Sequence, residues 1–222
     1  MTPIPTDRQE RDDCLGHAGV LYLAPAVARM TVAVVEEKIA RFKRDLGIVP
    51  VATMVQKHIT YGGCHILSDD QYFDLKVAVA EKFDLHPSEV LIVGSGKLGF
   101  SIAPTKRYRP FSDTSDIDVA LVSAQLFDNF WADVFQFKAE RNFWRKESAF
   151  NDYLVRGWIR PDMLPPAQRF RRAKEWWDFF SELSRKLKIN LKIRAGLYRA
   201  WPFLERYQSV CVGQCQSESV LR

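Results

Sequence analysis

"LIVGSGKLGFS", residues 91–101, places three glycines directly after an apolar run that is fit for a buried strand. Glycine-rich turns after a strand bring backbone amides close to phosphate groups, so such a stretch indicates a nucleotide-handling protein. Three kinds of phosphate-binding loop can be compared with it. The residues around the glycines must decide among them.

The first comparison is with the dinucleotide-binding fingerprint. Gly94, Gly96 and Gly99 satisfy its G-x-G-x-x-G spacing. That fingerprint requires a helix that begins inside the motif and continues beyond it, but Pro104 and Pro110 fall where this helix should run. A dinucleotide fold is therefore the weaker prediction.

The second comparison is with the P-loop of nucleoside triphosphatases. The pair Gly96-Lys97 has the right order, but Leu91 occupies the place of the first glycine. Leu98 occupies the place of the hydroxyl residue that would bind magnesium. Because two required positions fail, we set this comparison aside.

The third comparison joins the glycines to an acidic strand that follows, "SDTSDIDVALV", residues 112–122. Asp116 and Asp118 are two positions apart, so on a strand they point to the same face with Cα atoms about 6.6 Å apart. Two such carboxylates can hold two magnesium ions about 4 Å apart, which stabilise the attacking and leaving oxygens of a phosphoryl displacement. The amides of Gly94 and Ser95 would hold the triphosphate.

Together, "VGSGKLGFS" and "RPFSDTSDIDVALVS" resemble the polymerase-β-like nucleotidyltransferase superfamily. The resemblance implies an α+β fold with a small mixed sheet flanked by helices. It also implies that Gly94 and Ser95 contact the phosphates of the nucleotide, and that Asp116 and Asp118 are catalytic and coordinate two Mg²⁺ ions. Outside the motif, we expect four more residues to take part in nucleotide binding, the cations among them by balancing the triphosphate charge: Gly96, Lys97, Arg107 and Arg109.

The superfamily usually supplies a third carboxylate from a later strand. The candidate strand, "INLKIRAGLYRAW" at 189–201, has no carboxylate at its polar positions, Asn190, Lys192 and Arg194. Either Glu205 or Asp113 supplies the acid, or the chain has lost catalysis and keeps the fold for binding. Two functions follow: a magnesium-dependent nucleotidyltransferase, or an inactive module that binds nucleotide or nucleic acid or acts as an antitoxin.

The long gap between Gly94-Ser95 and Asp116 is similar to that of the oligoadenylate and cyclic-dinucleotide synthases. The chain also resembles, in size, the nucleotidyltransferases of Hailong antiphage systems. This resemblance implies an NTP or dNTP substrate, a nucleotide or oligonucleotide signal as product, and a partner effector or membrane protein encoded nearby. Our further hypothesis is that a hydroxyl of the polar end "QSESVLR", Ser217 or Ser219, primes the product.

Periodicity predicts three regions along the chain. Residues 1–67 form an N-terminal extension with a helix over 26–46 and a hairpin over 49–67. Residues 68–210 form the nucleotidyltransferase core, and residues 211–222 a flexible tail. Within the core we expect helices at 68–85, 124–137 and 165–189, strands at 90–93, 116–122 and 189–201, and a loop over 100–115. Aromatic residues at 176–180 have helical spacing and are predicted to be core rather than a base-stacking surface.

Composition narrows the class further. The 222-residue chain carries a formal charge of +5, a modest excess that favours anionic partners without identifying one. The start of the sequence is polar and acidic, unlike a secretory signal, and the apolar stretch 19–35 is interrupted by Pro25 and Arg29. Four scattered cysteines show no zinc-site spacing. We expect a cytoplasmic protein that is not embedded in a membrane.

Overall fold

The computed structural model describes residues 24–189 and 191–220, with side chains described from 32 to 217 apart from 190. The described chain divides into two units between Glu37 and Lys38. Helix α1 (Ala24–Leu46) begins in the first unit and ends in the second, which confirms the helix predicted over 26–46. All the elements after α1 belong to the second unit.

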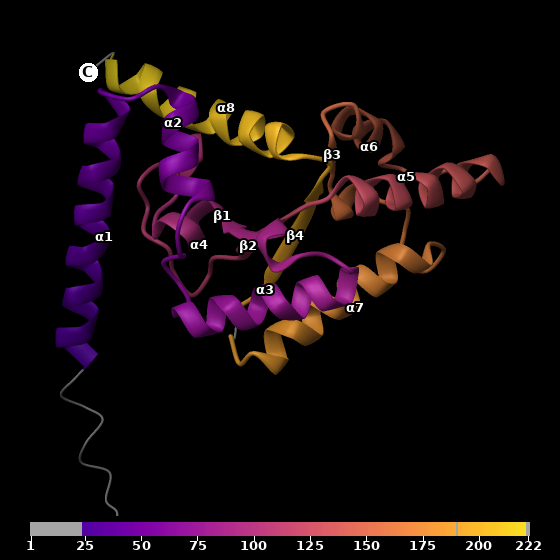
Figure 1. Ribbon diagram of the computed structural model, residues 1–222, viewed down its shortest axis with the longest axis horizontal. Helices are drawn as coiled ribbons and strands as arrows, with labels where there is room; N and C mark the ends of the chain where they lie inside the picture. The colour runs from indigo at the N-terminus through magenta and orange to yellow at the C-terminus, as the bar shows by residue number, and fades with distance from the viewer. Residues whose placement is uncertain (1–23, 190, 221–222) are drawn as a thin grey trace, which may run out of the picture. The chain divides into compact units, whose positions relative to one another are not determined.

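A small mixed sheet forms the centre of this unit (Figure 1). Its strands are β1 (Val90–Val93), β2 (Ile117–Val122), β3 (Trp158–Ile159) and β4 (Ile193–Tyr198), in the spatial order β1-β2-β4-β3. The central pair, β2 and β4, is parallel, whereas both outer pairings are antiparallel. The predicted α+β class with a small mixed sheet is therefore confirmed.

One face of the sheet is covered by helices. These are α3 (Asp69–Phe83), α5 (Ala124–Ala139) and α7 (Arg171–Lys186), and α3 and α7 lie side by side (Figure 1). The ring of Phe83 in α3 lies 5.0 Å from that of Trp176 in α7. Alternate residues of β2 and β4 point into this apolar layer: Ile117, Val119, Leu121, Ile193, Ala195 and Leu197. The residues between these positions point to the opposite face of the sheet, where they are available to form a functional site.

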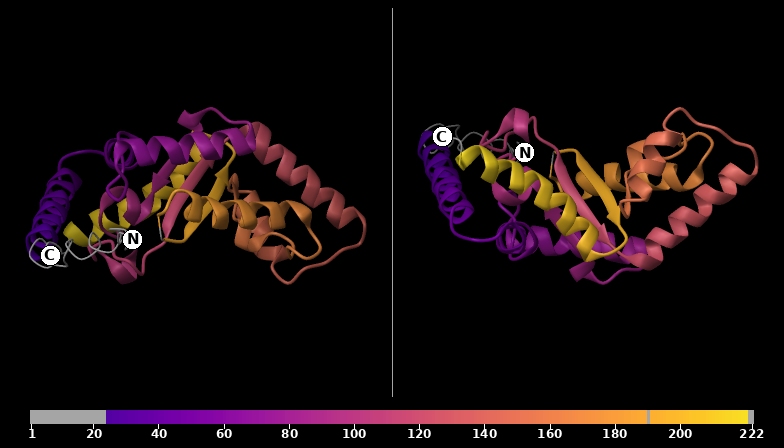
Figure 2. Two further views of the ribbon diagram at one scale, coloured as in Figure 1. Left: turned by 90° about the horizontal axis from the view of Figure 1, so that it is seen from below. Right: turned by 90° about the horizontal axis from the view of Figure 1, so that it is seen from above.

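The opposite face is crossed by α8 (Trp201–Val220), which packs against α2 (Val51–Val55) (Figures 1 and 2). The hairpin predicted over 49–67 is wrong, because residues 51–60 are helical, with α2 continuing into a π-helical turn. Met54, Val55 and Ile59 are fully buried there. Packing of this apolar set therefore overrides the β propensity of its branched residues.

The predicted flexible tail is also wrong as far as Val220, because residues 211–220 belong to α8. Two contacts hold this part of the helix. Cys215 is buried with its thiol 3.7 Å from the carbonyl of Ile102, and the Gln216 amide donates to the carbonyl of Leu46. Of the two serines proposed as primers, Ser217 lies in α8, and the side chain of Ser219 is outside the described part.

Most other predicted elements are present. Ser68 caps α3 through a capping box with Gln71, and residues 100–115 form a loop with only one 3₁₀ turn, Pro104–Lys106. Helix α7 starts at Arg171, six residues later than predicted, because the prolines at 165 and 166 lie in the preceding turn. A short helix, α6 (Glu147–Leu154), was not predicted. Among the described residues no helix combines the length and apolar character needed to cross a membrane.

Candidate functional site

The three glycines surround a very short helix, α4 (Gly94–Leu98), that follows β1 directly. Gly94 has φ +63° at its start and Gly99 has φ +89° just after its end. A Cβ atom on Gly99 would lie 2.7 Å from the His65 ring, so both the backbone and the neighbouring ring require glycine there. The spacing thus reflects the two ends of a five-residue helix, and the long helix of a dinucleotide fold is absent from residues 94–115.

The glycine bend lies directly against the acidic strand. Val93, the residue before the bend, pairs in register with Asp118 of β2. A Cβ atom on Gly94 would lie only 3.1 Å from Oδ2 of Asp118. Two stretches that are separated in the sequence therefore meet at one point.

The carboxylate of Asp118 has no bonded partner among the described residues, because it makes no hydrogen bond or ion pair with any of them. Its pKa is raised to about 6, chiefly because surrounding protein atoms displace water, with repulsion from Asp116 adding to the shift and the charge of Arg194 opposing it. The side chain is nevertheless exposed, because it faces a cavity. An open carboxylate oxygen in such a place is suited to bind a hard cation.

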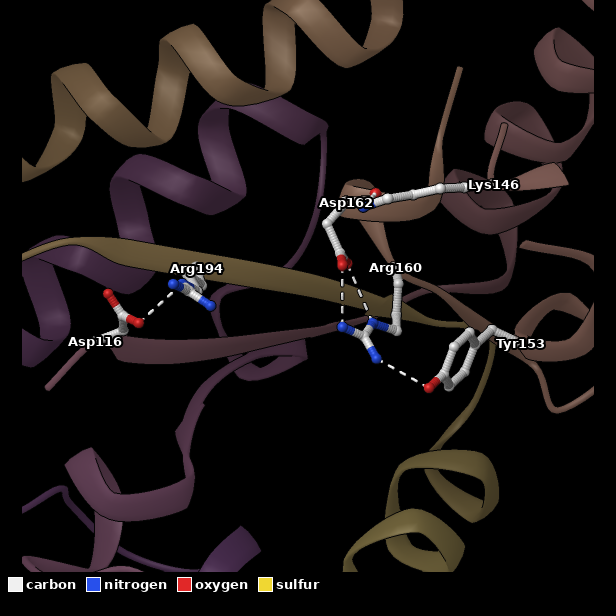
Figure 3. Close-up of polar contacts among 6 residues, drawn as sticks. All are labelled: Asp116, Lys146, Tyr153, Arg160, Asp162 and Arg194. Carbon is white, nitrogen blue, oxygen red and sulfur yellow. Dashed lines mark hydrogen bonds and ion pairs between the residues drawn. The ribbon is translucent and has the colours of Figure 1, made fainter. Parts of the chain in front are cut away.

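Asp116 lies just before β2 and is already paired. Its Oδ2 atom is 2.9 Å from Nε of Arg194 on β4 (Figure 3). Arg194 is also the register partner of Asp118 across the parallel strands. The position beside the two acids where a third carboxylate was expected therefore carries a guanidinium group.

A cavity of about 550 Å³ extends from Asp118 across this face of the sheet. Alternate residues of β4 form part of its wall, as strand periodicity requires. Its polar or charged lining includes Ser95, Ser101, Asp118, Arg160, Asp162, Lys192, Arg194 and Gln208. The volume lies in the range of small-molecule sites, roughly 300–1,000 Å³.

The end of the cavity near β3 is aromatic. The ring of Trp158 stacks on that of Tyr198 at 5.2 Å, and the ring of Tyr207 from α8 lies 4.4 Å from Trp158. Arg160 lies beside these rings and donates to both carboxylate oxygens of Asp162 and to the hydroxyl of Tyr153 (Figure 3). This end therefore offers flat apolar surfaces beside fixed polar groups.

Asp162 is a carboxylate of the cavity that the sequence analysis missed. It lies in a 3₁₀ turn, Pro161–Met163, directly after β3. A two-residue strand leaves no readable alternation, so no sequence signal could have located it. Glu205 and Asp113, the two acids proposed instead, do not line the cavity.

Four of the residues predicted to bind nucleotide do not line the cavity: Gly96, Lys97, Arg107 and Arg109. Gly96 is packed against Ile66, and Arg109 is exposed on the loop. The Lys97 ammonium group is buried and donates to the carbonyls of residues 61, 62 and 63 at 2.5–2.7 Å. Burial lowers the pKa of Lys97 to about 8, so the group is still charged at neutral pH and acts as a structural tie.

Arg107 likewise lies away from the cavity, and its guanidinium donates to the carbonyl of Gln214 in α8 at 3.5 Å. Ser217 also lies outside the cavity, and its hydroxyl donates to the carbonyl of Gly213. A priming role for Ser217 would therefore require the cavity of a second molecule.

The aromatic run at 176–180 divides between core and cavity. Trp176 and Phe180 are fully buried, as predicted. Trp177 is partly buried against the core and also lines the cavity. The expectation that this run is core is therefore confirmed for Trp176 and Phe180 and only in part for Trp177, because neighbouring positions on a helix point in different directions.

Asp116 and Asp118 are the residues that would hold magnesium. The open carboxylate of Asp118 fits a cation, whereas Asp116 must first be released by Arg194. Within the described residues no cluster of three or more metal-binding side chains occurs, so further oxygen ligands would come from the ligand or from water. Comparisons with protein-family models, curated proteins and solved structures found no match to this chain.

Proposed function

We propose that the chain is a magnesium-dependent nucleotidyltransferase with a polymerase-β-like fold, which transfers a nucleoside monophosphate from an NTP or dNTP to a hydroxyl acceptor. The observation that carries this proposal is the direct contact between the glycine bend and the acidic strand, with Gly94 against Asp118. It places a small backbone turn and an open carboxylate at one end of a cavity of nucleotide size.

The charges along the cavity support an anionic ligand. Arg194 of β4 is the register partner of Asp118, and Lys192 lies just before this strand. Both line the cavity, and neither contributes to the apolar core. The hydroxyl of Ser95 makes no hydrogen bond to a described residue and borders the cavity beside the bend. A triphosphate in this position would receive donors from all three side chains.

In the proposed reaction the acceptor oxygen attacks the α-phosphorus and the bond to the bridging oxygen breaks. Pyrophosphate leaves, and the proton of the hydroxyl passes to solvent. Bound Mg²⁺ would supply charge stabilisation to the attacking and leaving oxygens. Asp118 would hold the cation, while Lys192 and Arg194 would balance the charge of the leaving pyrophosphate.

A second candidate is a nucleotide-binding module without catalysis, acting alone or as an antitoxin. The ion pair between Arg194 and Asp116 favours it, because a guanidinium occupies one of the two carboxylates needed for a metal pair. Both candidates use the same cavity and differ only in whether a bond is broken. The production of a signal for a partner effector in antiphage defence belongs to the first candidate and depends on turnover.

Incubation with each labelled NTP and dNTP in the presence of Mg²⁺ separates the two candidates. The native chain should release pyrophosphate, and Asp118→Ala and Asp116→Ala should abolish the release. Asp113→Ala is the matched control, because this acid is exposed and lies off the cavity. Nucleotide binding without pyrophosphate release from any of the eight substrates would decide for the non-catalytic module, and absence of binding would reject both.

A further inference from the structure

Gln208 is a buried polar residue with an unusual position. Only three polar or charged side chains are classed as buried in the described part of the chain: Lys97, Ser123 and Gln208. Lys97 donates to backbone carbonyls, and Ser123 accepts a hydrogen bond from the amide of Leu126. Gln208 is 4% exposed and makes no hydrogen bond to any described residue. Neither polar atom of its amide is among the fully buried side-chain atoms that lack a partner, so the amide can be reached by a ligand although most of the side chain is buried, and this opening asks for an explanation.

The cavity provides that explanation, because Gln208 lines it from α8. Its chain neighbour Tyr207 also lines the cavity and is 41% exposed. The ring of Tyr207 is backed by Trp158 at 4.4 Å and by Tyr198 at 6.4 Å. An amide without a protein partner and a supported aromatic ring thus come from consecutive positions of α8, and both residues line the cavity.

This pairing matches the two requirements of a planar heterocycle. An aromatic face accepts a flat ring by stacking regardless of its identity. An amide presents one donor and one acceptor side by side, which pair with the adjacent donor and acceptor on the edge of a base. A sugar or an aliphatic chain would use neither property fully.

We propose that Gln208 reads the edge of the nucleobase, and that Tyr207 supports the face of that base. The inference rests on the proposed function, since it requires the triphosphate to lie at the Gly94 end. Strands β1 and β3 stand at the two ends of the sheet, about 14 Å apart at about 4.8 Å per strand. An extended nucleotide can therefore place its phosphates beside Asp118 and its base beside Gln208.

The test compares the affinities of five ligands, each with Mg²⁺: ATP, GTP, CTP, UTP and inorganic tripolyphosphate, which has no base. They are measured by calorimetry on the native full chain and on Gln208→Met, which keeps the length of the side chain and removes the amide. The native chain should prefer one base over the weakest by about tenfold, the factor that corresponds to about 1.4 kcal/mol. Gln208→Met should lose this preference and bind tripolyphosphate as the native chain does.

Each other outcome overturns the inference. Equal affinity of the native chain for all four nucleotides excludes base reading, as does an unchanged preference in Gln208→Met. An equal loss of nucleotide and tripolyphosphate affinity in Gln208→Met would show that Gln208 is only structural. If tripolyphosphate and all four nucleotides fail to bind the native chain, the proposed function fails together with the inference. If tripolyphosphate alone binds, the phosphate site stands and only the base site is rejected.

A second variant distinguishes edge reading from stacking. Tyr207→Leu should weaken all four nucleotides by a similar factor and leave the order of preference unchanged, because stacking tolerates any base. A change in the order of preference in Tyr207→Leu, with no change in Gln208→Met, would assign base reading to Tyr207 and overturn the role of Gln208.

Discussion

The guanidinium of Arg194 binds the carboxylate of Asp116 at 2.9 Å while standing in register with Asp118 on the neighbouring strand. The charged group of Arg194 thus lies beside both Asp116 and Asp118, the two acids proposed to bind metal. Because a metal ion and a guanidinium compete for the same carboxylate oxygens, the ion pair should weaken metal binding to the free chain. Five predictions rest on this arrangement and on three others in the site.

Removal of the competing cation should strengthen metal binding. We expect Arg194→Gln to raise the affinity for Mn²⁺, in the absence of nucleotide, by up to about fivefold, since a partly exposed ion pair contributes about 1 kcal/mol at most. The same variant should weaken nucleotide binding, because Arg194 lines the cavity and is one of the proposed donors to phosphate. Calorimetric titration measures both, with Arg109→Gln as the control that lies off the cavity. Unchanged Mn²⁺ affinity in Arg194→Gln would show that Asp116 takes no part in metal binding.

Acid should weaken the site through Asp118. Its pKa of about 6 means that the carboxylate becomes protonated as the pH falls through 6, so Mn²⁺ affinity should fall by about tenfold per pH unit below that value. Calorimetry between pH 5 and pH 8 measures this dependence. An affinity that stays constant down to pH 5 would contradict the assignment of Asp118 as the metal ligand.

Protonation of the same group should stabilise the metal-free fold. In the unfolded chain Asp118 keeps its ordinary pKa near 3.8, so between pH 6 and pH 4 the folded state binds more protons and its stability rises as the pH falls. Asp118→Asn should remove this contribution and be more stable at pH 7.5, on the order of 1 kcal/mol because the carboxylate is exposed to the cavity. Thermal unfolding of both chains across this pH range provides the measurement.

The first glycine of the bend should tolerate no side chain. Gly94→Ala places a Cβ atom 3.1 Å from the Asp118 carboxylate, at a residue whose φ is +63°. We therefore expect the variant to lose about 1–2 kcal/mol of folding stability and to bind metal more weakly. Gly213→Ala is the matched control, because it lies in α8 with nothing within 4 Å of the new Cβ atom. It should be neutral or stabilising by about 0.5–1 kcal/mol. Chemical unfolding compares the two, and equal stabilities would contradict a strained contact at Gly94.

Lys97 should matter for stability rather than for ligand affinity. Lys97→Met removes three hydrogen bonds from a buried ammonium group to backbone carbonyls, which should cost about 3 kcal/mol at roughly 1 kcal/mol for each. The exposed Lys106, replaced by Met, should have little effect on stability. Denaturant titration tests the pair. If Lys97→Met keeps its stability and loses affinity for tripolyphosphate, Lys97 contacts phosphate and its structural role is wrong.

The elements around the site were largely readable from the sequence. The alternation in residues 117–122 and the capping signal at Ser68 reflect local physics, and both elements are present as predicted. The error at residues 51–60 has a tertiary cause, because the branched residues there are buried by helices that come from elsewhere in the chain. Local patterns therefore located most strands and helices, but they did not predict the tertiary packing that makes residues 51–60 a helix instead of a hairpin.

The cavity was predictable only in part. Gly94 and Asp118 stand out by residue type and spacing, whereas Gln208 and Tyr207 look like ordinary positions of a helix. Their relation to the site depends on where α8 crosses the sheet, which no local pattern encodes. The same holds for Lys97, whose charge suggested phosphate and whose partners are three backbone carbonyls contributed by another segment.

The parallel pairing of β2 with β4 has a consequence for the order in which the molecule assembles. Asp118 leaves the ribosome well before β4, since α5, α6, β3 and α7 are all synthesised between them. Contacts between distant segments form late, because closing a long loop is entropically costly. During synthesis Asp116 and Asp118 therefore emerge before the strand that carries Arg194, and the proposed phosphate site can form only after β4 has emerged.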